Sequence, residues 1–318
     1  MATERSPAGG ELVFVVGVSR SGTTLVRNIL NRHSLIAIGP ENHYLGHLVG
    51  FEGVRHRLRR FGDLRDDANL RQAVAYLFHG MHTGRHWREP SRLWQWLRRN
   101  VDEVDFLNRL HAGDRSERAI FAEVLRAYGE RKGKPIIGEK TPAHLRYVDT
   151  LLEWFPDARV IHMMRDPRGI FVSDARRRRL EPGSVPFRVL RRVPPLLDLV
   201  VLLQTTLAWG ESVARARAYL RRHRGRYRVI RFEDLVRDPE RVVIELSEFV
   251  RVPFEPAMLE QSVVSAGTRL GERGFDPGAA DRWRAVIPGW AAAWLRLVFG
   301  RQLRRLGYEP ATPRVAGR

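Results

Sequence analysis

The feature that most constrains this chain is a glycine-rich turn near its N-terminus. Residues 17–24, GVSRSGTT, follow an apolar, β-branched run at 12–18 and precede Leu25, Ile29 and Leu30 at helical spacing. An apolar run without alternation is typical of a strand covered on both faces of a parallel sheet. Strand, turn and helix in this order open a βαβ unit, and glycines let the backbone N–H groups of the turn wrap an anion. The sequence therefore predicts an anion-binding loop at the edge of a parallel sheet.

Short apolar runs and helical patterns alternate along the rest of the chain. Further strands are predicted at 35–38, 135–138, 159–164 and 227–232, and helices at 143–154, 169–178, after Pro239 and at 288–306. This alternation predicts one α/β domain over residues 1–318, a P-loop-type doubly wound, mostly parallel sheet flanked by helices. We also expect a helical insertion at about 41–133, a flexible Pro/Arg-rich loop at about 176–195 and a polar tail at 309–318.

The composition limits the classes of protein to which this chain can belong. It has 318 residues, 43% of them hydrophobic, and no cysteine, so it can bury a sizeable core and holds no thiolate nucleophile or cysteine-bound metal. The formal charge of +19 indicates anionic partners. Nearly all basic residues are arginines spread over the whole chain, a bias that genome composition alone could also produce, and both explanations stay open.

Two segments bear on where the protein acts. Residues 1–10 include Glu4 and Arg5 and lack the apolar core of a signal peptide. The longest apolar stretch, after Pro195, is interrupted by Asp198 and Gln204 and is shorter than the roughly 20 residues that a membrane span needs. We therefore expect a cytoplasmic protein without stable membrane insertion. The sequence leaves the oligomeric state open.

The glycine-rich turn departs from the phosphate loop of nucleoside triphosphatases. The spacing from Gly17 to Gly22 matches that loop, but Thr23 stands where a lysine would reach the outer phosphates. Arg20 instead places a positive charge inside the turn. Such a turn is poorly suited to Mg-ATP and well suited to a phosphate or a sulfuryl phosphate.

Three stretches together resemble the PAPS-dependent sulfotransferase family. They are residues 16–25 with His33 and then 39–41 (GPE), residues 165–173 (RDPRGIFVS), and residues 231–239 (RFEDLVRDP), and the closing 282–284 (RWR) is also similar to bacterial members. The resemblance implies that PAPS is the cofactor and PAP the product. It implies cofactor contacts at Arg20, Ser21, Gly22, Thr23, Thr24 and Leu25 for the 5′-phosphosulfate, at Arg165 and Ser173 for the 3′-phosphate, and at Arg282, Trp283 and Arg284.

The same resemblance implies a catalytic set. Cytosolic members have a histidine after a Lys-Thr pair, whereas this chain has Lys140-Thr141-Pro142, and the Gly39-Pro40-Glu41 stretch is similar to that of tyrosylprotein sulfotransferases, whose glutamate is the base. Glu41 is thus the expected general base, and Lys140 and Arg20 are expected to stabilise the leaving phosphate. His43, Glu139 and His144 stay open as competing bases. The acceptor is expected to be a small molecule with a phenolic, carbohydrate or lipid hydroxyl, contacted by His43 and Tyr44, with Trp87, Trp94 and Trp96 as further aromatics near it.

Other interpretations remain at this point. A P-loop kinase or NTPase would use Asp166 as a magnesium ligand, and a basic nucleic-acid-binding protein would use the charge of +19, although no nucleic-acid-binding motif is present. The run Arg176 to Arg179 is predicted to be a solvated helix end rather than a patch for polyanions. No metal site is expected, since the histidines and the Asp66-Asp67 pair lack ligand spacing.

Overall fold

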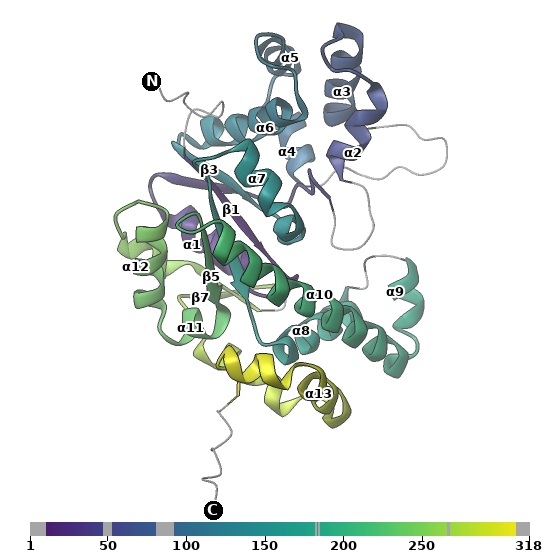
Figure 1. The fold of residues 1–318 in the computed structure, drawn as a ribbon, viewed down its shortest axis with the longest axis vertical. Helices are drawn as coiled ribbons and strands as arrows, with labels where there is room; N and C mark the ends of the chain where they lie inside the picture. The colour runs from purple at the N-terminus through teal and green to yellow at the C-terminus, as the bar shows by residue number, and fades with distance from the viewer. Residues whose placement is uncertain are drawn as a thin grey trace, which may run out of the picture.

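The structure of the protein, a computed structural model, describes residues 11–46, 53–80, 92–181, 183, 185–265 and 268–309, with side chains except at 92–94 and 262–272. Parallel strands form one sheet in the order β2-β3-β1-β4-β5 (Figure 1). They are β1 (Leu12–Gly17), β2 (Ile36–Gly39), β3 (Ile136–Lys140), β4 (Arg159–Met164) and β5 (Tyr227–Arg231). The predicted strands are confirmed with ends shifted by one or two residues.

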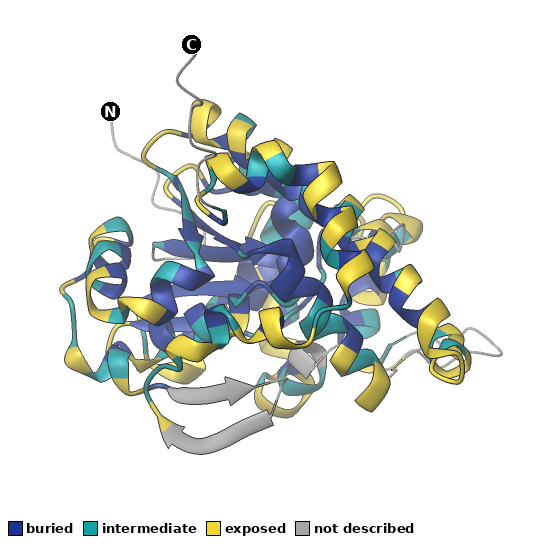
Figure 2. Cartoon of the chain, turned by 90° about the horizontal axis from the view of Figure 1, so that it is seen from below, coloured by how far each residue is buried: buried dark blue, intermediate teal, exposed yellow. Residues whose placement is uncertain are grey.

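Helices cover both faces of this sheet, which explains why β1 is an unbroken apolar run. Every residue of β1 is buried, and Figure 2 shows the sheet as the buried centre of the molecule. On one face, side chains such as Val13 and Val15 pack on α1 (Thr23–Arg32), α11 (Phe232–Arg237) and α12 (Pro239–Phe249). On the other, Phe14 and Val16 pack on α6 (Glu117–Lys132) and α7 (Val148–Trp154), with a short 3-10 helix at Pro142–Tyr147 before α7. The doubly wound α/β prediction is confirmed.

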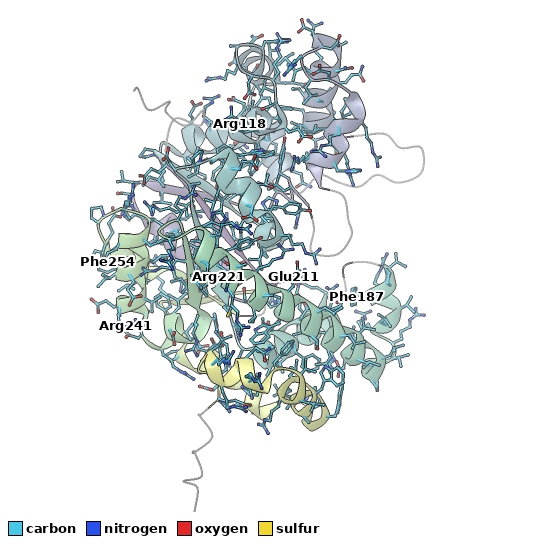
Figure 3. All side chains as sticks on the ribbon, viewed as in Figure 1. Arg118, Phe187, Glu211, Arg221, Arg241 and Phe254 are labelled. Atoms are coloured by element: carbon cyan, nitrogen blue, oxygen red, sulfur yellow. The ribbon has the colours of Figure 1, made fainter. Side chains whose placement is uncertain are left out.

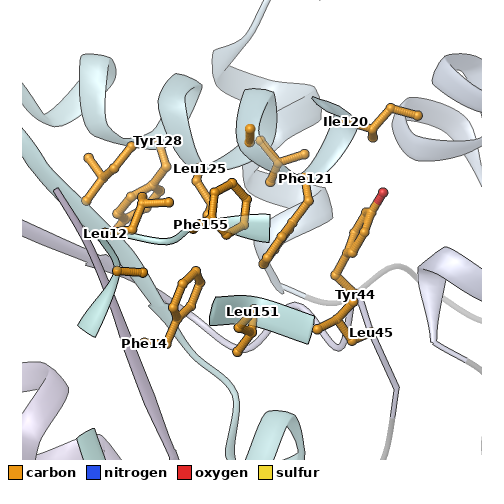
Figure 4. Packing of buried hydrophobic residues seen from close by; sticks show 14 of the residues in the cluster. Leu12, Phe14, Tyr44, Leu45, Ile120, Phe121, Leu125, Tyr128, Leu151 and Phe155 are labelled. Atoms are coloured by element: carbon orange, nitrogen blue, oxygen red, sulfur yellow. The ribbon is translucent and has the colours of Figure 1, made fainter. Parts of the chain in front are cut away.

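The chain between β2 and β3 is helical in its described parts. It contains α2 (Val54–Leu58) with a 3-10 turn at Arg59–Phe61, α3 (Asp67–His79), α4 (Arg92–Asn100), α5 (Glu103–His111) and α6. The side chains of Asp66, Asp102 and Ser116 accept backbone N–H groups at the starts of α3, α5 and α6, as N-caps do. Aromatic packing joins these helices to the sheet: the Phe121 ring of α6 lies between Tyr44 and Phe14 (Figure 4).

The segment expected as a flexible loop at 176–195 is largely helical, which corrects that expectation. It holds the end of α8 (Pro167–Leu180), all of α9 (Val185–Leu190) and the start of α10 (Pro194–Arg222). The guanidinium carbon of Arg178 lies 3.6 Å from the ring centroid of Phe187, so α9 is attached to α8 by a cation–π contact. Phe187 is labelled on α9 in Figure 3. Prolines at 194 and 195 start α10 instead of extending a loop, because the first turn of a helix does not need their N–H groups.

The stretch after Pro195 also differs from its expectation. It belongs to the 29-residue helix α10, whose most apolar window has a mean hydropathy of 1.3. Asp198 lies within this helix and forms an ion pair with Arg179. By length and composition alone, α10 is the one helix in the described part of the chain that could cross a membrane. However, 44% of that window is buried inside the fold, so one side of the helix serves the core.

The C-terminal part adds elements that the sequence did not indicate. An antiparallel pair, β6 (Ser262–Ser265) and β7 (Thr268–Arg273), follows a 3-10 helix at Pro256–Glu260. Two further 3-10 helices, Pro277–Ala280 and Arg282–Ala285, lead into α13 (Gly289–Arg305), which confirms the predicted last helix. Residues 1–10, Trp87, the side chain of Trp94 and the tail after Glu309 lie outside the description.

Candidate active site

All predicted motifs lie at the carboxyl edge of the sheet. Because the strands are parallel, β1 ends at the glycine-rich turn, β2 at Gly39 before Glu41, β3 at Lys140 and β4 directly before Arg165. These ends surround a cavity of about 1040 Å³. Its lining includes the following predicted site residues: Arg20, Gly22, Thr23, Thr24, Leu25, Glu41, His43, Lys140, Arg165, Ser173, Arg282 and Trp283. Motifs separated by more than a hundred residues in sequence thus meet in one site.

The glycine-rich turn has the geometry of an anion cradle. Gly22 has φ = 102° and precedes the first residue of α1, and a Cβ built on it would lie 2.6 Å from a ring carbon of Phe232. Only glycine adopts this positive φ without strain and leaves room for the Phe232 ring. The N–H groups of Thr23 and Thr24 belong to the first turn of α1, where a helix has no carbonyl of its own to receive them, so they favour an anion.

Arg20 and Arg165 carry the positive charge of this cradle. Arg20 adopts φ = 72°, a left-handed conformation that is costly for a side chain other than glycine, and its Nε donates to Ser173 Oγ at 3.1 Å. Burial lowers the pKa of Arg20, and the nearby charge of Arg177 lowers it further. Both guanidinium groups stay protonated at neutral pH.

Arg165 connects the cradle to the C-terminal segment. Its Nη1 donates to the Arg20 carbonyl and its Nη2 to the Ala279 carbonyl, both at 3.1 Å, while its guanidinium lies 4.0 Å from the ring centroid of Phe232. Burial lowers the pKa of Arg165 to about 10, partly offset by the carboxylate of Glu233. The buried Nε has no hydrogen-bond partner among the described residues. A buried, charged group with an unused donor on a cavity wall fits an anionic ligand.

Glu41 lines the same cavity as the cradle and contacts Lys140 and His43. Its Oε1 accepts from Lys140 Nζ, and its Oε2 lies 3.4 Å from His43 Nε2. Burial would raise the pKa of Glu41, but the hydrogen bond from His43 and the charge and hydrogen bond of Lys140 more than offset it and lower the pKa to about 2. Glu41 is therefore an ionised carboxylate at neutral pH, ready to accept a proton but held by these partners.

The competing bases Glu139 and His144 lie in a closed buried network. Both side chains are fully buried and outside the cavity lining, with His144 Nδ1 2.6 Å from Glu139 Oε1. The Leu45 N–H donates to His144 Nε2 at 3.1 Å, and Thr141 Oγ1 donates to the second Glu139 oxygen. All these acceptors are occupied by protein groups, so neither residue can reach a proton in the cavity. Of the competitors, only His43 lines it.

Four residues predicted at or near the site are placed elsewhere. The ring of Tyr44 stacks on Phe121 at 4.6 Å between centroids and its hydroxyl donates to the Glu117 carbonyl at 2.6 Å, so it packs in the core rather than contacting an acceptor. Trp96 is likewise near Tyr128, away from the cavity. Ser21 is fully buried beneath the turn, and Arg284 pairs with Asp281 outside the cavity. Sequence order could not distinguish these from their neighbours on the wall.

The arginine run is closer to the site than expected. Arg176, Arg177 and Arg179 line the cavity, whereas Arg178 turns away to Asp174 and Phe187. The prediction of a solvated helix end therefore holds for Arg176 and Arg179, which are exposed near the C-terminal end of α8, while Arg177 is half-buried; the sequence did not indicate that all three border the cavity. The reason is that α8 starts at the cavity edge and runs along it, which places successive turns of its C-terminal half beside the opening.

Asp166 does not have the geometry of a magnesium ligand. Its carboxylate caps α8 by accepting the Arg168 N–H at 2.8 Å, and both of its oxygens accept from the Arg168 guanidinium. The guanidinium carbon of Arg168 also lies 4.4 Å from the ring centroid of Trp283, a cation–π contact. Among the residues with described side chains, no cluster of three or more His, Asp or Glu could hold a metal ion.

Sequence reasoning missed several wall residues. The Phe232 ring packs against the Arg165 guanidinium. Gln261, Phe275 and Asp276 reach the cavity from the segment around β6 and β7. Phe232 lies inside a motif that the sequence singled out, so its position directly after a strand was an available signal. The hairpin segment carries no such signal, because its place on the wall is set by long-range packing.

Comparison with protein families identifies the class. A profile described as "Sulfotransferase family" matches residues 12–256, which is more than half of the chain. The chain therefore belongs to the sulfotransferase family of enzymes.

Individual relatives agree with this assignment. The chain is 23% identical over 308 residues to protein-tyrosine sulfotransferase A of Caenorhabditis elegans, covering 94% of this chain and 67% of that protein. It is 28% identical over 296 residues to the nodulation protein NoeE of Sinorhizobium fredii, covering 87% and 60%. It spans less than half the length of some other curated relatives. The sulfotransferase domain of the Synechococcus PCC 7002 olefin synthase shares the fold, with a TM-score of 0.57 at 20% identity over 98% of this chain and 100% of that one.

Proposed function

We propose that this chain transfers a sulfuryl group from PAPS to the hydroxyl of a small-molecule acceptor and releases PAP. The observation that carries the proposal is the cavity itself, which is lined together by an anion cradle, two partly buried arginines and an ionised carboxylate. In-line transfer needs positive charge over the sulfuryl and leaving oxygens and a proton acceptor near the attacking hydroxyl. The family assignment and the tyrosine-sulfotransferase match support the same reaction.

The cradle would hold the phosphosulfate end of PAPS. The first-turn N–H groups at Thr23 and Thr24 and the Arg20 guanidinium present donors to it, and Leu25 lies on the same wall. When bound, PAPS supplies a sulfuryl group whose bond to the 5′-phosphate breaks as its bond to the acceptor oxygen forms. Arg20 and the N–H groups then balance the charge that develops on the leaving oxygens.

Arg165 and Ser173 would hold the 3′-phosphate. Arg165 keeps one unused buried donor at Nε, and Ser173 Oγ, already an acceptor for Arg20, still has its own O–H to donate. Trp283 and Arg282 lie on the adjoining wall, where a nucleotide base and a phosphate would meet a ring and a cation. Arg284, outside the lining, has no part in this proposal.

Glu41 would take the proton of the acceptor. It is ionised and lines the cavity, and it contacts Lys140, the residue proposed to stabilise the leaving phosphate. If Lys140 moves its ammonium toward the leaving oxygen, Glu41 loses a charge partner and becomes a stronger base at the moment when a proton must be accepted. His43 orients the carboxylate and contacts the acceptor in this arrangement.

The acceptor class and the location belong to the proposal as well. The tyrosine-sulfotransferase relative supports a phenolic hydroxyl, and the absence of cysteine from all 318 residues fits a cytoplasmic site of action. The kinase alternative is disfavoured because Asp166 is fully engaged by Arg168 and Thr23 replaces the phosphate-loop lysine.

Calorimetry with PAP and with ATP, each in the presence of a chelator, tests this function. We expect PAP to bind without a metal and at least about tenfold more tightly than ATP, since only PAP carries a 3′-phosphate for Arg165 and Ser173. Binding of ATP that requires Mg²⁺, together with no binding of PAP, would establish a nucleoside triphosphatase instead. Salt-sensitive retention on DNA without PAP binding would favour the nucleic-acid interpretation.

A further inference from the structure

Exposed hydrophobic side chains gather at one end of the molecule. Of the 16 large hydrophobic residues that are exposed among those described, 13 fall within residues 180–207 and 286–298. These two segments contain α9, the first half of α10 and most of α13 (Figure 1). We refer to the exposed leucines, valines and tryptophans of these two segments as the apolar face. Such a concentration is unusual for a surface that only meets water.

The apolar face has regular stripes on two neighbouring helices. On α10, Leu196, Leu199, Leu203 and Leu207 recur at spacings of three and four, and Leu207 is 75% exposed. On α13, Trp290, Trp294, Leu297 and Val298 form a second stripe, and Leu297 is 81% exposed. The hydrogen bond from Trp294 Nε1 to Thr206 Oγ1, 3.1 Å, shows that the two stripes lie side by side.

Positive charge accompanies this face and negative charge is scarce. Residues 180–207 and 286–298 together contain four arginines and two acidic residues, Glu181 and Asp198, and residues 299–305 add three further arginines. Arg301 is exposed and continues the α13 stripe one turn beyond Leu297. On α10, the acidic residue Asp198 is paired with Arg179. A second copy of this chain would bring arginines against arginines, which disfavours a symmetric dimer through this face.

The apolar face also adjoins the cavity. Trp290 makes an edge contact with Phe171 at 6.5 Å between ring centroids, and Phe171 lines the cavity. Val286, 64% exposed, and Pro288 line the cavity directly before α13 begins. Asp198, between two leucines of the α10 stripe, is also on the cavity wall. A surface seated on the apolar face would therefore lie next to the opening of the site.

We propose that the apolar face docks on a lipid bilayer that carries anionic headgroups. Leucines enter the boundary of the acyl region, tryptophans occupy the interface that they favour, and arginines meet the anionic headgroups. The buried side of α10 stays in the protein core, so the helix lies on the membrane and does not span it. In a second step, which rests on the proposed function and narrows its acceptor, the hydroxyl, phenolic or aliphatic, is carried by a lipid and presented at headgroup level to Glu41.

Co-sedimentation with vesicles tests the docking directly. The full chain is mixed with vesicles of phosphatidylcholine alone and of phosphatidylcholine with phosphatidylserine. We expect binding to the mixed vesicles to exceed binding to the neutral ones by about tenfold and to fall as salt is added. A chain that stays in the supernatant with mixed vesicles at low salt overturns the proposal.

Two matched double variants assign the binding to the face. Leu203→Glu/Leu207→Glu should reduce the partition onto mixed vesicles at least about tenfold. Val104→Glu/Leu220→Glu makes the same chemical change at residues 64% and 46% exposed outside the face, and should leave binding unchanged. An equal loss of vesicle binding in both variants overturns the assignment. It is also overturned if the first variant alone changes from dimer to monomer in light scattering and still binds vesicles, because the face would then be a dimer interface.

Calorimetry with PAP separates this inference from the proposed function. Both double variants should keep the affinity for PAP and the thermal midpoint of the unaltered chain, because their substitutions lie on exposed positions outside the cavity lining. PAP binding without vesicle binding refutes the docking and leaves sulfuryl transfer intact. Vesicle binding without PAP binding retains the docking and refutes the proposed function together with the lipid acceptor.

Discussion

Removing the guanidinium of Arg165 is the sharpest test of how the cavity holds its nucleotide. This group spans the site, because it donates to the Arg20 carbonyl of the turn and to the Ala279 carbonyl of the C-terminal segment. It is buried over the ring of Phe232 and keeps its Nε donor unused by the described residues. Arg165→Ala therefore removes one proposed phosphate contact and the connection between two walls.

The size of the effect follows from the charged hydrogen bond. A hydrogen bond to a charged partner contributes about 1.5–3 kcal/mol, which corresponds to about 10- to 150-fold in the dissociation constant of PAP. The pKa of Arg165, lowered to about 10 by burial, keeps the group charged at neutral pH, so the full charged contact is at stake. Arg165→Lys retains a charge but cannot donate to both carbonyls and a phosphate, and an intermediate loss is expected.

Calorimetric titration with PAP measures these losses, with Arg284→Ala as the control. Arg284 carries the same charge but lies outside the cavity lining, where it pairs with Asp281 and its guanidinium carbon lies 4.8 Å from the ring centroid of Trp283. We expect the control to bind PAP within about threefold of the unaltered chain. A phosphate contact at Arg165 is excluded if Arg165→Ala also binds PAP within threefold of the unaltered chain, or if Arg284→Ala loses as much affinity as Arg165→Ala.

Four further predictions concern the base, the pH response and the core. Glu41→Gln should lower kcat by about 10²- to 10⁴-fold and leave PAP affinity unchanged, and near-full turnover would place the base elsewhere. His43→Ala should raise the pKa of Glu41 by removing a hydrogen bond, so the acid limb of the pH profile of kcat should move to higher pH. Complete inactivity at every pH would instead indicate that His43 is the base. Burial lowers the pKa of His162 to about 3. Between that pH and about 6.5, the unfolded chain therefore binds a proton that the folded chain does not. The free energy of unfolding should fall by about 2 kcal/mol from pH 6.5 to pH 5 in denaturant titrations. The loss should be absent in His162→Asn, and an equal slope in that variant would exclude His162 as the cause. Gly138→Ala should destabilise the fold by about 3 kcal/mol or more in the same assay, since its Cβ would lie 1.8 Å from the Val13 carbonyl oxygen, and a stable variant would mean that the strands can separate.

Predictions from sequence succeeded where the signal was local. The unbroken apolar run of residues 12–17 identified β1, because a strand covered on both faces has no polar alternation. The failures involve segments whose structure depends on distant partners. The expected loop at 176–195 is largely helical because α9 and the start of α10 pack on α8, and Phe187 is attached by Arg178.

Local sequence patterns alone predicted that an anion-binding turn, a lysine and an arginine would each follow a strand, and parallel pairing brings such positions to one edge of the sheet. Which acidic group faces the cavity depends on the packing of the whole fold. Glu139 and Lys140 are consecutive in β3, and consecutive side chains of a strand point to opposite faces. Lys140 meets Glu41 at the cavity, whereas Glu139 turns inward to His144. Which of the two faces became the site depends on the helices that pack against the sheet, and no pattern within the strand specifies them.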